Sequence, residues 1–141
     1  MTFVADPLVH RVIGCAITVH RELGPGLLES TYARCFMLEL AHQRIRFSNE
    51  VWLPILYRGT RLDNAYRMDL VVEEWLVVEV KAIDRILPVH TSQLLTYLRL
   101  ARAKQGLLLN FNHPKLKDGI KSVLPGGSVT SLSSDPSTDE E

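Results

Sequence analysis

Residues 65–81 read AYRMDLVVEEWLVVEVK, and this stretch decides the fold. Two runs rich in apolar and β-branched side chains, 65–72 and 75–81, flank the pair Glu73-Glu74, a pattern typical of a β-hairpin. The second run is apolar on both faces until Glu79, as expected for a strand in the middle of a sheet. The sequence therefore predicts two adjoining strands, with charged side chains near the end of the second.

Asp69 and Glu79 lie ten residues apart on these two strands. Directly opposed residues of a hairpin project to the same face. A two-residue loop at Glu73-Glu74 would oppose Asp69 to Val78, which separates the two carboxylates. We therefore predict a loop with an odd number of residues, such as 73–75, or a bulge in the ladder.

Lys81 follows Glu79 by two positions, so both side chains project to the same face of the strand. Two carboxylates bind a hard cation such as Mg²⁺ through oxygen, and a nearby ammonium stabilises negative charge on a phosphoryl group. The set Asp69, Glu79 and Lys81 therefore suits metal-dependent phosphodiester hydrolysis. The alternative is a plain ion pair between Glu79 and Lys81 at a strand end.

The other elements surround this hairpin. In chain order, we predict helices over 6–23 and about 27–44, a strand over 50–57, the two hairpin strands, a helix over 89–104, a strand over 106–111 and a last helix over 114–123. Pro54 favours an edge position for the first strand. The order α-α-β-β-β-α-β-α predicts an α/β protein with a mixed sheet flanked by helices.

The chain has 141 residues, which suits one domain over 1–124. The stretch 125–141 is rich in Ser, Thr and acids, so we predict a disordered acidic tail. It holds four acids and no Lys or Arg, which leaves 16 basic and 12 acidic residues, about +4, on the body. This mildly basic body permits nucleic-acid contact, but no aromatic-rich platform for single strands is apparent. No apolar run approaches the ~18 residues of a membrane span, and a cytoplasmic protein is the simplest expectation.

Two predicted helices carry further polar candidates. Glu29 falls on the stripe Glu29, Ala33, Phe36 and Leu40, a largely apolar face on which a carboxylate is costly unless it is paired or bound to metal. Gln93 and Tyr97 are four apart and share a helix face. An amide and a phenol there can orient water, phosphate or base. The alternative is that both are polar residues exposed to solvent without a functional role.

Three other residues have two open interpretations each. His20, near a helix C-terminus, is either a metal ligand or a histidine stabilised there by the helix dipole. Tyr32 either hydrogen-bonds Glu29 or is a core aromatic residue. Arg67 is expected on the strand face opposite Asp69, as a structural residue or a phosphate contact.

These motifs resemble a known family. Gly26-Leu27-Leu28-Glu29-Ser30-Thr31-Tyr32 matches the signature of the GxxExxY proteins, and the resemblance runs from about Leu8 to Val123. It also includes Val19-His20-Arg21-Glu22-Leu23-Gly24-Pro25-Gly26, Tyr66-Arg67-Met68-Asp69, Val78-Glu79-Val80-Lys81-Ala82, Gln93 to Tyr97 and Asn110-Phe111. That family is similar to the PD-(D/E)XK nucleases, near the RecB-type exonuclease domain. In this chain Met68 replaces the proline that commonly precedes the first acid.

The resemblance implies a restriction-endonuclease-like core and a set of site residues. It implies Mg²⁺ or Mn²⁺ as cofactor, DNA as partner, and a homodimer or a larger protein complex as a further option. The implied metal ligands are Glu29, Asp69, Glu79 and the main-chain carbonyl of Val80, with His20 as an additional candidate. The implied catalytic residues are Asp69, Glu79, Lys81, Gln93 and Tyr97.

Three functions remain open from the sequence. The first is a metal-dependent nuclease acting on DNA. The second is a catalytically silent module with the nuclease fold that binds nucleic acid or a protein partner. The third is an unrelated domain in which Glu79 and Lys81 form an ion pair, and it predicts Glu29 more than roughly 10 Å from Asp69, because carboxylates that share a cation lie within its ligand shell.

Overall fold

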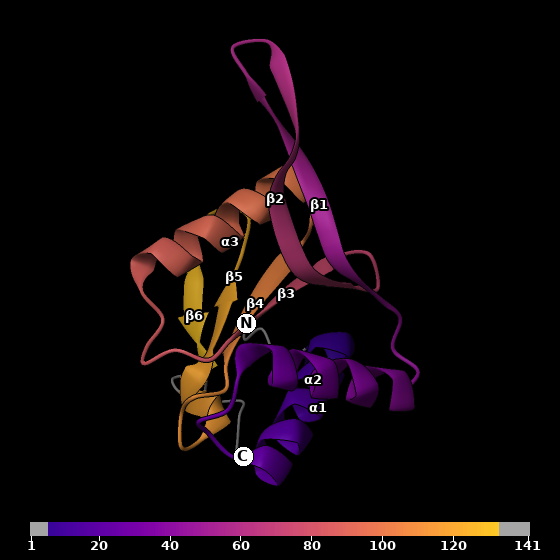
Figure 1. Cartoon of the computed structure of the whole chain (residues 1–141), viewed down its shortest axis with the longest axis vertical. Coiled ribbons are helices and arrows are strands. Elements are labelled where there is room, and N and C mark those ends of the chain that lie inside the picture. Colours follow the sequence, from indigo (N-terminus) through magenta and orange to yellow (C-terminus); the bar gives the residue numbers. More distant parts are fainter. Residues whose placement is uncertain (1–5, 133–141) are drawn as a thin grey trace.

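A computed structural model describes residues 6–132 of the chain. The elements are α1 (Pro7–Leu23), α2 (Glu29–His42), β1 (Phe47–Tyr57), β2 (Thr60–Val72), β3 (Leu76–Lys81), α3 (Pro88–Ala101), β4 (Gln105–Asn110), the 3-10 helix η2 (Leu116–Gly119), β5 (Ile120–Val123) and β6 (Val129–Ser131). The strands form one sheet in the order β1-β2-β3-β4-β5-β6. The β3–β4 pair is parallel and is joined through α3, whereas the other pairs are antiparallel (Figure 1). The predicted α/β class with a mixed sheet is confirmed.

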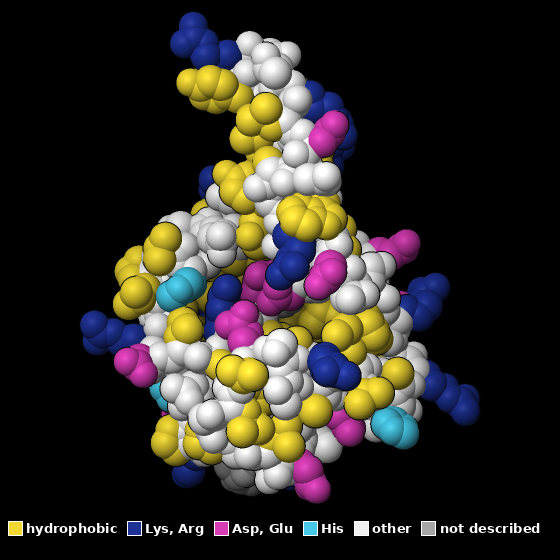
Figure 2. Space-filling model, in the orientation of Figure 1, with side chains coloured by type: hydrophobic (Ala, Val, Ile, Leu, Met, Phe, Trp, Pro, Cys, Tyr) yellow, Lys and Arg dark blue, Asp and Glu magenta, His cyan; other side chains and the backbone are white. Residues whose placement is uncertain are grey.

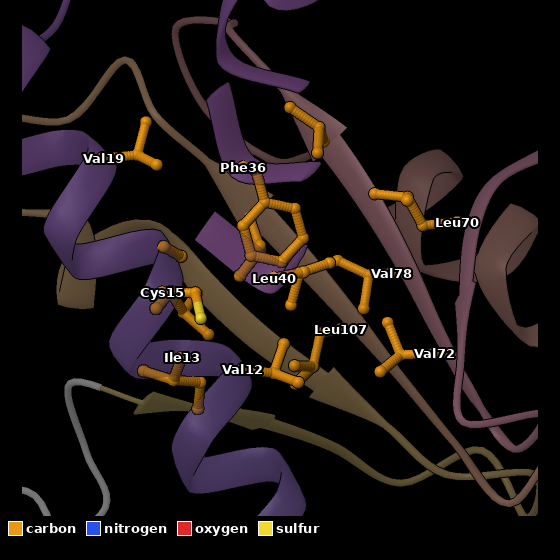
Figure 3. Packing of buried hydrophobic residues seen from close by; sticks show 14 of the residues in the cluster. Val12, Ile13, Cys15, Val19, Phe36, Leu40, Leu70, Val72, Val78 and Leu107 are labelled. Carbon is orange, nitrogen blue, oxygen red and sulfur yellow. The ribbon is translucent and has the colours of Figure 1, made fainter. Parts of the chain in front are cut away.

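Two apolar clusters hold the helices on opposite faces of the sheet. Helices α1 and α2 pack on one face against alternate residues of β2, β3 and β4, among them Leu70, Val78 and Leu107 (Figure 3). Helix α3 packs on the other face, where Leu94 and Leu98 meet residues such as Val77. Because strand side chains alternate between faces, β3 is covered on both sides, as its apolar sequence predicts.

The first helix begins and ends where its sequence indicates. The Asp6 carboxylate accepts hydrogen bonds from the amides of Leu8 and Val9, at 2.8 and 3.3 Å, and so satisfies two of the helix's free N–H groups. Gly24 follows the last turn with φ of +70°, a conformation that glycine adopts without steric cost. The chain then turns sharply into α2.

The β2–β3 hairpin has the predicted odd loop. Val72 pairs with Leu76, so residues 73–75 form the connection. The ladder continues to Leu70 opposite Val78, and the same register sets Asp69 opposite Glu79. The two carboxylates therefore share one face, and the two-residue alternative is excluded.

The β1–β2 hairpin is longer than predicted and forms an arm that projects beyond the helices (Figure 1). β1 is an edge strand, as Pro54 indicated. The register shifts there, because Leu53 pairs with Tyr66 but Ile55 pairs with Leu62. A bulge increases strand twist, which turns the outer part of the arm away from the body.

The end of the chain differs from the prediction. The helix expected over 114–123 is wrong, because η2 has four residues and 120–123 form β5. Gly119 disfavours a continuous helix, and residues 120–123 pair with β4 instead. The segment expected to be disordered from 125 onward also needs correction, because β6 pairs with β5. Residues 133–141 of that predicted tail lie outside the described residues.

Within residues 6–132, no helix combines the length and the apolar character that crossing a membrane requires.

Candidate functional site

The carboxylates of Asp69 and Glu79 each accept a hydrogen bond from a backbone amide of the neighbouring strand. The Asp69 amide donates to the Glu79 carboxylate at 2.8 Å, and the Val80 amide donates to the Asp69 carboxylate at 2.9 Å. The regular β2–β3 ladder has ended one pair earlier, at Leu70 and Val78. Side-chain oxygens thus replace the missing backbone partners and fix both carboxylates at the point where the ladder stops.

Glu79 is a buried acid with only 4% of its surface exposed. Its burial, and then the neighbouring Asp69 charge, raise the pKa of Glu79 to about 8. The hydrogen bond from the Asp69 amide and the positive charge of Lys81 oppose this rise, whereas the Glu29 charge adds to it. A buried acid with a raised pKa beside a second carboxylate is typical of sites that bind a cation or transfer a proton.

Lys81 lies on the same face of β3 as Glu79, since the two are separated by one residue. Its side chain is half-buried, and its charge lowers the pKa of Glu79. The ion pairs within residues 6–132 are Arg46–Glu73, Arg61–Asp63 and Arg67–Glu50. Glu79 and Lys81 are not among these pairs, so the plain ion pair considered as an alternative does not form within 4.0 Å.

Glu29 reaches the same region from the other side. It is the first residue of α2 and is exposed, so the argument that it occupies an apolar face is wrong. The buried residues of that helix are Tyr32, Phe36 and Leu40. Glu29 instead lines a cleft of about 290 Å³ together with Asp69, at a helix N-terminus where the helix dipole favours a carboxylate.

Tyr97 closes the α3 side of the site. It is buried at 4% exposure and stands edge-on to Tyr66, with ring centroids 5.8 Å apart. Burial, and then the Glu79 and Asp69 charges, raise the pKa of Tyr97 to about 12. Gln93, one turn earlier on α3, is exposed. The tyrosine thus lies beside the acids as a protonated phenol, whereas the amide stands at the rim of that helix face.

His20 and Tyr32 have structural contacts. His20 Nε2 donates to the His113 carbonyl at 2.7 Å, and the ring lies near Phe111, so these contacts do not support its candidacy as a metal ligand. Tyr32 is fully buried, stacks on Phe111 and donates its hydroxyl to the Gly24 carbonyl. The core interpretation of Tyr32 is confirmed, and its hydroxyl holds the loop that leads into Glu29.

Arg67 lies on the site side of β2, which corrects the prediction that it faces away from Asp69. Arg67 and Asp69 both line the cleft below the arm. The guanidinium is 3.5 Å from the Glu50 carboxylate and lies over the Trp52 ring, 6.0 Å from its centroid. It therefore adds a positive charge and an aromatic neighbour to the rim.

The charged side chains of the site gather on one part of the molecular surface, as the space-filling view shows (Figure 2). Acidic side chains collect in a hollow where α2, α3 and the base of the arm meet, with basic side chains beside them and an apolar strip that continues up the arm (Figure 2). A hollow with acids at its centre and cations at its rim suits a ligand that carries both a metal ion and a polyanion.

Asn110 is a site-supporting residue that the sequence indicated only through the family resemblance. Its amide, fully buried, donates to the Ile83 carbonyl at 2.9 Å and accepts from the Ile83 amide at 3.0 Å. These bonds fix the chain just beyond Lys81. A single buried Asn at a strand end carries no periodic signal, which is why the pattern alone gives it no role.

The donor set suits a hard cation in part. Asp69 and Glu79 supply two carboxylates, and the Val80 carbonyl lies on the Asp69 side of β3, because Val80 directs its amide there and strand geometry places both groups of one residue on the same side. No group of three or more His, Cys, Asp and Glu side chains in the described part of the chain is arranged to hold a metal ion. The structure thus brings two of the predicted carboxylates together and leaves Glu29 across the cleft.

A mixed sheet with two opposed acids and a lysine at the end of its central strand defines the class of nuclease-like α/β domains. The chain belongs to the PD-(D/E)XK nuclease superfamily, whose family model matches residues 6–123. Neither the curated proteins nor the solved structures contain a significant match. Nucleases of this superfamily generally use divalent metal ions.

Proposed function

We propose that the protein is a metal-dependent phosphodiester hydrolase that cleaves DNA, with Mg²⁺ or Mn²⁺ as cofactor. The observation that carries this proposal is the Asp69–Glu79 pair, held by the hydrogen bonds between β2 and β3 and flanked by Lys81. Burial of Glu79, and then the neighbouring Asp69 charge, raise the pKa of Glu79 to about 8. A bound cation would offset the repulsion between the two carboxylates and favour the charged form of Glu79.

Asp69, Glu79 and the Val80 carbonyl would hold the cation, which when bound polarises the phosphoryl oxygen and lowers the pKa of water. Because the carboxylates already accept hydrogen bonds from the Asp69 and Val80 amides, their orientation is fixed before a ligand arrives. The Lys81 ammonium stabilises negative charge that develops on the phosphate.

Tyr97, Gln93 and Glu29 have supporting roles in this proposal. Tyr97 keeps its proton at every physiological pH because its pKa is raised to about 12, so it acts as a hydrogen-bond donor to phosphate or water. Gln93 offers its amide from the exposed face of α3. Glu29 faces Asp69 across the cleft, where its carboxylate can accept a hydrogen bond from a water bound between them.

The test is cleavage of linear, nicked and single-stranded DNA with Mg²⁺ or Mn²⁺, compared with EDTA. Asp69→Asn, Glu79→Gln and Lys81→Ala should each lower the rate by at least ~100-fold, the usual effect of removing one charge-stabilising group. Glu22→Gln and Lys104→Ala are matched controls, since both side chains are exposed outside the site. Cleavage that survives Asp69→Asn or Lys81→Ala belongs to a contaminant and overturns the proposal.

The second candidate is a catalytically silent module that keeps the nuclease fold. The exposed Glu29 and the lack of a three-side-chain metal cluster within residues 6–132 favour it. Titration calorimetry with Mn²⁺ separates the two functions. Binding that disappears in Glu79→Gln supports the hydrolase, whereas DNA binding without any metal binding supports the silent module.

A further inference from the structure

The arm formed by β1 and β2 presents arginine and apolar side chains in opposed pairs. Trp52 pairs with Arg67, and Leu56 pairs with Arg61. Directly opposed residues of an antiparallel pair project to one face, and Trp52 and Leu56, four apart on β1, share a face of that strand. These four side chains form a strip, which we call the arm strip.

The arm strip is open to solvent although two of its members are large and apolar. Trp52 is 52% exposed and Leu56 is 75% exposed. Tyr57, at the tip of the arm, is 63% exposed. Exposed apolar patches rimmed by polar residues are typical of binding surfaces. Figure 1 shows no element of the described chain packed against the outer arm.

The charge of the arm identifies the kind of partner. Residues 50–67 contain three arginines against Glu50 and Asp63, which gives +1. Arg61 forms an ion pair with Asp63, and Arg67 forms one with Glu50. The four side chains are 46–70% exposed, so a stronger anion can replace both carboxylate partners. Arginine forks match phosphate geometry in two hydrogen bonds, so the strip is suited to a polyanion.

The arm strip is continuous with the acidic site. Arg67 lines the cleft that contains Asp69 and Glu29, and it belongs to the same strand as Asp69. A polyanion that lies on Arg61 and Arg67 is therefore led towards the acids at the end of β2. This continuity connects the strip to the proposed substrate.

We infer that the arm strip binds single-stranded DNA, with a base stacked on Trp52 and the flanking phosphates bound by Arg61 and Arg67. An exposed indole ring stacks only on a base whose face is free, and the bases of a duplex are covered by their neighbours. Arg67 supports the ring through its position over the indole. A second copy of the chain is the poorer occupant, because two arms that each carry +1 repel each other.

The inference rests on the proposed DNA substrate, yet binding is measured separately from cleavage. The chain has two tryptophans, Trp52 and the partly buried Trp75. In Trp75→Phe, the fluorescence of Trp52 alone reports on the arm. The probe is oligothymidylate of about 20 nucleotides, which is longer than the ~16 nucleotides of a large single-domain site. With EDTA present, it should quench the Trp52 fluorescence, and a duplex of the same length should not.

Arm variants give the affinity. Trp52→Ala should weaken single-strand binding by about 5- to 100-fold, the range for one stacked base. Arg61→Gln should weaken it and should lower the slope of log affinity against log salt by about 0.7, the loss of one phosphate contact on a single strand. Leu38→Ala and Arg21→Gln are matched controls on exposed helix positions and should leave the affinity unchanged.

The outcomes separate the two proposals. Arm-dependent binding without metal-dependent cleavage supports the arm strip and rejects the hydrolase. Cleavage with single-strand affinity unchanged in both Trp52→Ala and Arg61→Gln rejects the arm strip alone. Equal quenching by duplex DNA, or a wild-type dimer that Leu56→Ala dissociates in sedimentation, also overturns the inference.

Discussion

Asp69 and Glu79 exchange hydrogen bonds across β2 and β3 in place of the backbone ladder, the Asp69 amide donating to Glu79 and the Asp69 carboxylate accepting from Val80. Both acids are thereby oriented at the same position where two strands separate. The arrangement is electrostatically costly without a cation, because burial and mutual repulsion raise the pKa of Glu79 to about 8. In the proposed hydrolase, stability and metal binding are therefore linked through the Glu79 side chain.

The first prediction concerns pH and stability of the metal-free protein. The pKa of Glu79 is about 8 in the folded chain and near 4.5 in the unfolded chain, so folding favours the protonated form. Its contribution to the free energy of unfolding is full below pH 4.5 and is lost as pH rises through 8. The loss is at most ~1.4 kcal/mol per pH unit in this window.

Urea denaturation of chelator-treated protein between pH 5 and 8 measures this loss, and Glu79→Gln is the comparison. The glutamine keeps an oxygen to accept from the Asp69 amide but cannot ionise, so its free energy of unfolding should change less with pH. Equal pH slopes for the two proteins would show that Glu79 does not titrate in this range.

The second prediction is that metal binding releases a proton. At pH 7, Glu79 with a pKa of about 8 is mostly protonated, and a cation binds the carboxylate form. Titration of Mn²⁺ in buffers of different ionisation enthalpy should show release of close to one proton per ion at pH 7 and much less at pH 9. Metal affinity should rise over the same interval, and Asp69→Asn should abolish both effects.

The hairpin at the site was predictable because side chains alternate between the two faces of a regular strand. Once Asp69 and Glu79 are required to share a face, only an odd loop or a bulge satisfies the geometry, and the three-residue loop 73–75 is present. The caps of α1 and the edge position of β1 followed from Asp6 and Pro54 in the same local way. Local rules decided these features because no distant contact competes with them.

Other features depend on contacts that the sequence does not display. Residues 120–123 have helical spacing, yet they form β5. The backbones of β4 on one side and β6 on the other supply their hydrogen-bond partners. Glu29 is exposed since α2 starts at that residue, after the loop fixed by Tyr32. The arm strip has no sequence signal, because its four side chains are dispersed over residues 52–67 and meet only when the hairpin folds.

The third prediction tests packing of α3 on the sheet. A Cβ at Gly106 would lie 2.8 Å from the Leu94 side chain, so Gly106→Ala should lower the free energy of unfolding by about 1–3 kcal/mol through overpacking. Combining it with Leu94→Ala should cost less than the sum of the two single changes. Urea denaturation provides all three values.

Gly14→Ala is the control for that experiment. Gly14 lies inside α1, and a Cβ there meets nothing within 4 Å. Alanine should stabilise the helix by about 0.5–1 kcal/mol. Destabilisation by both alanines would mean that the close approach of Leu94 is not the cause at Gly106.

The fourth prediction separates Tyr97 as a donor from Tyr97 as a base. With a pKa raised to about 12, the phenol does not lose its proton in the range in which DNA cleavage is measured. Tyr97→Phe should therefore lower kcat by about 10-fold, as expected for one lost hydrogen bond of ~1.4 kcal/mol, without changing the shape of the pH profile below pH 9. Disappearance of a basic limb from that profile would identify Tyr97 as a proton acceptor instead.

The fifth prediction concerns the support of Lys81. Asn110 bonds both the amide and the carbonyl of Ile83, and the Lys81 carbonyl accepts from the Phe111 amide at 2.9 Å. Asn110→Ala leaves the Ile83 groups without these partners, which costs about 1–3 kcal/mol each where they stay buried. We expect faster hydrogen exchange at the Ile83 amide, and a lower kcat because Lys81 loses its fixed position. Asn112→Ala is the control. It removes an exposed hydrogen bond from the Gly26 amide and should leave the Ile83 amide protected. Exchange at Ile83 that is the same in wild type and Asn110→Ala would show that the β3 end is fixed by the β4 ladder alone.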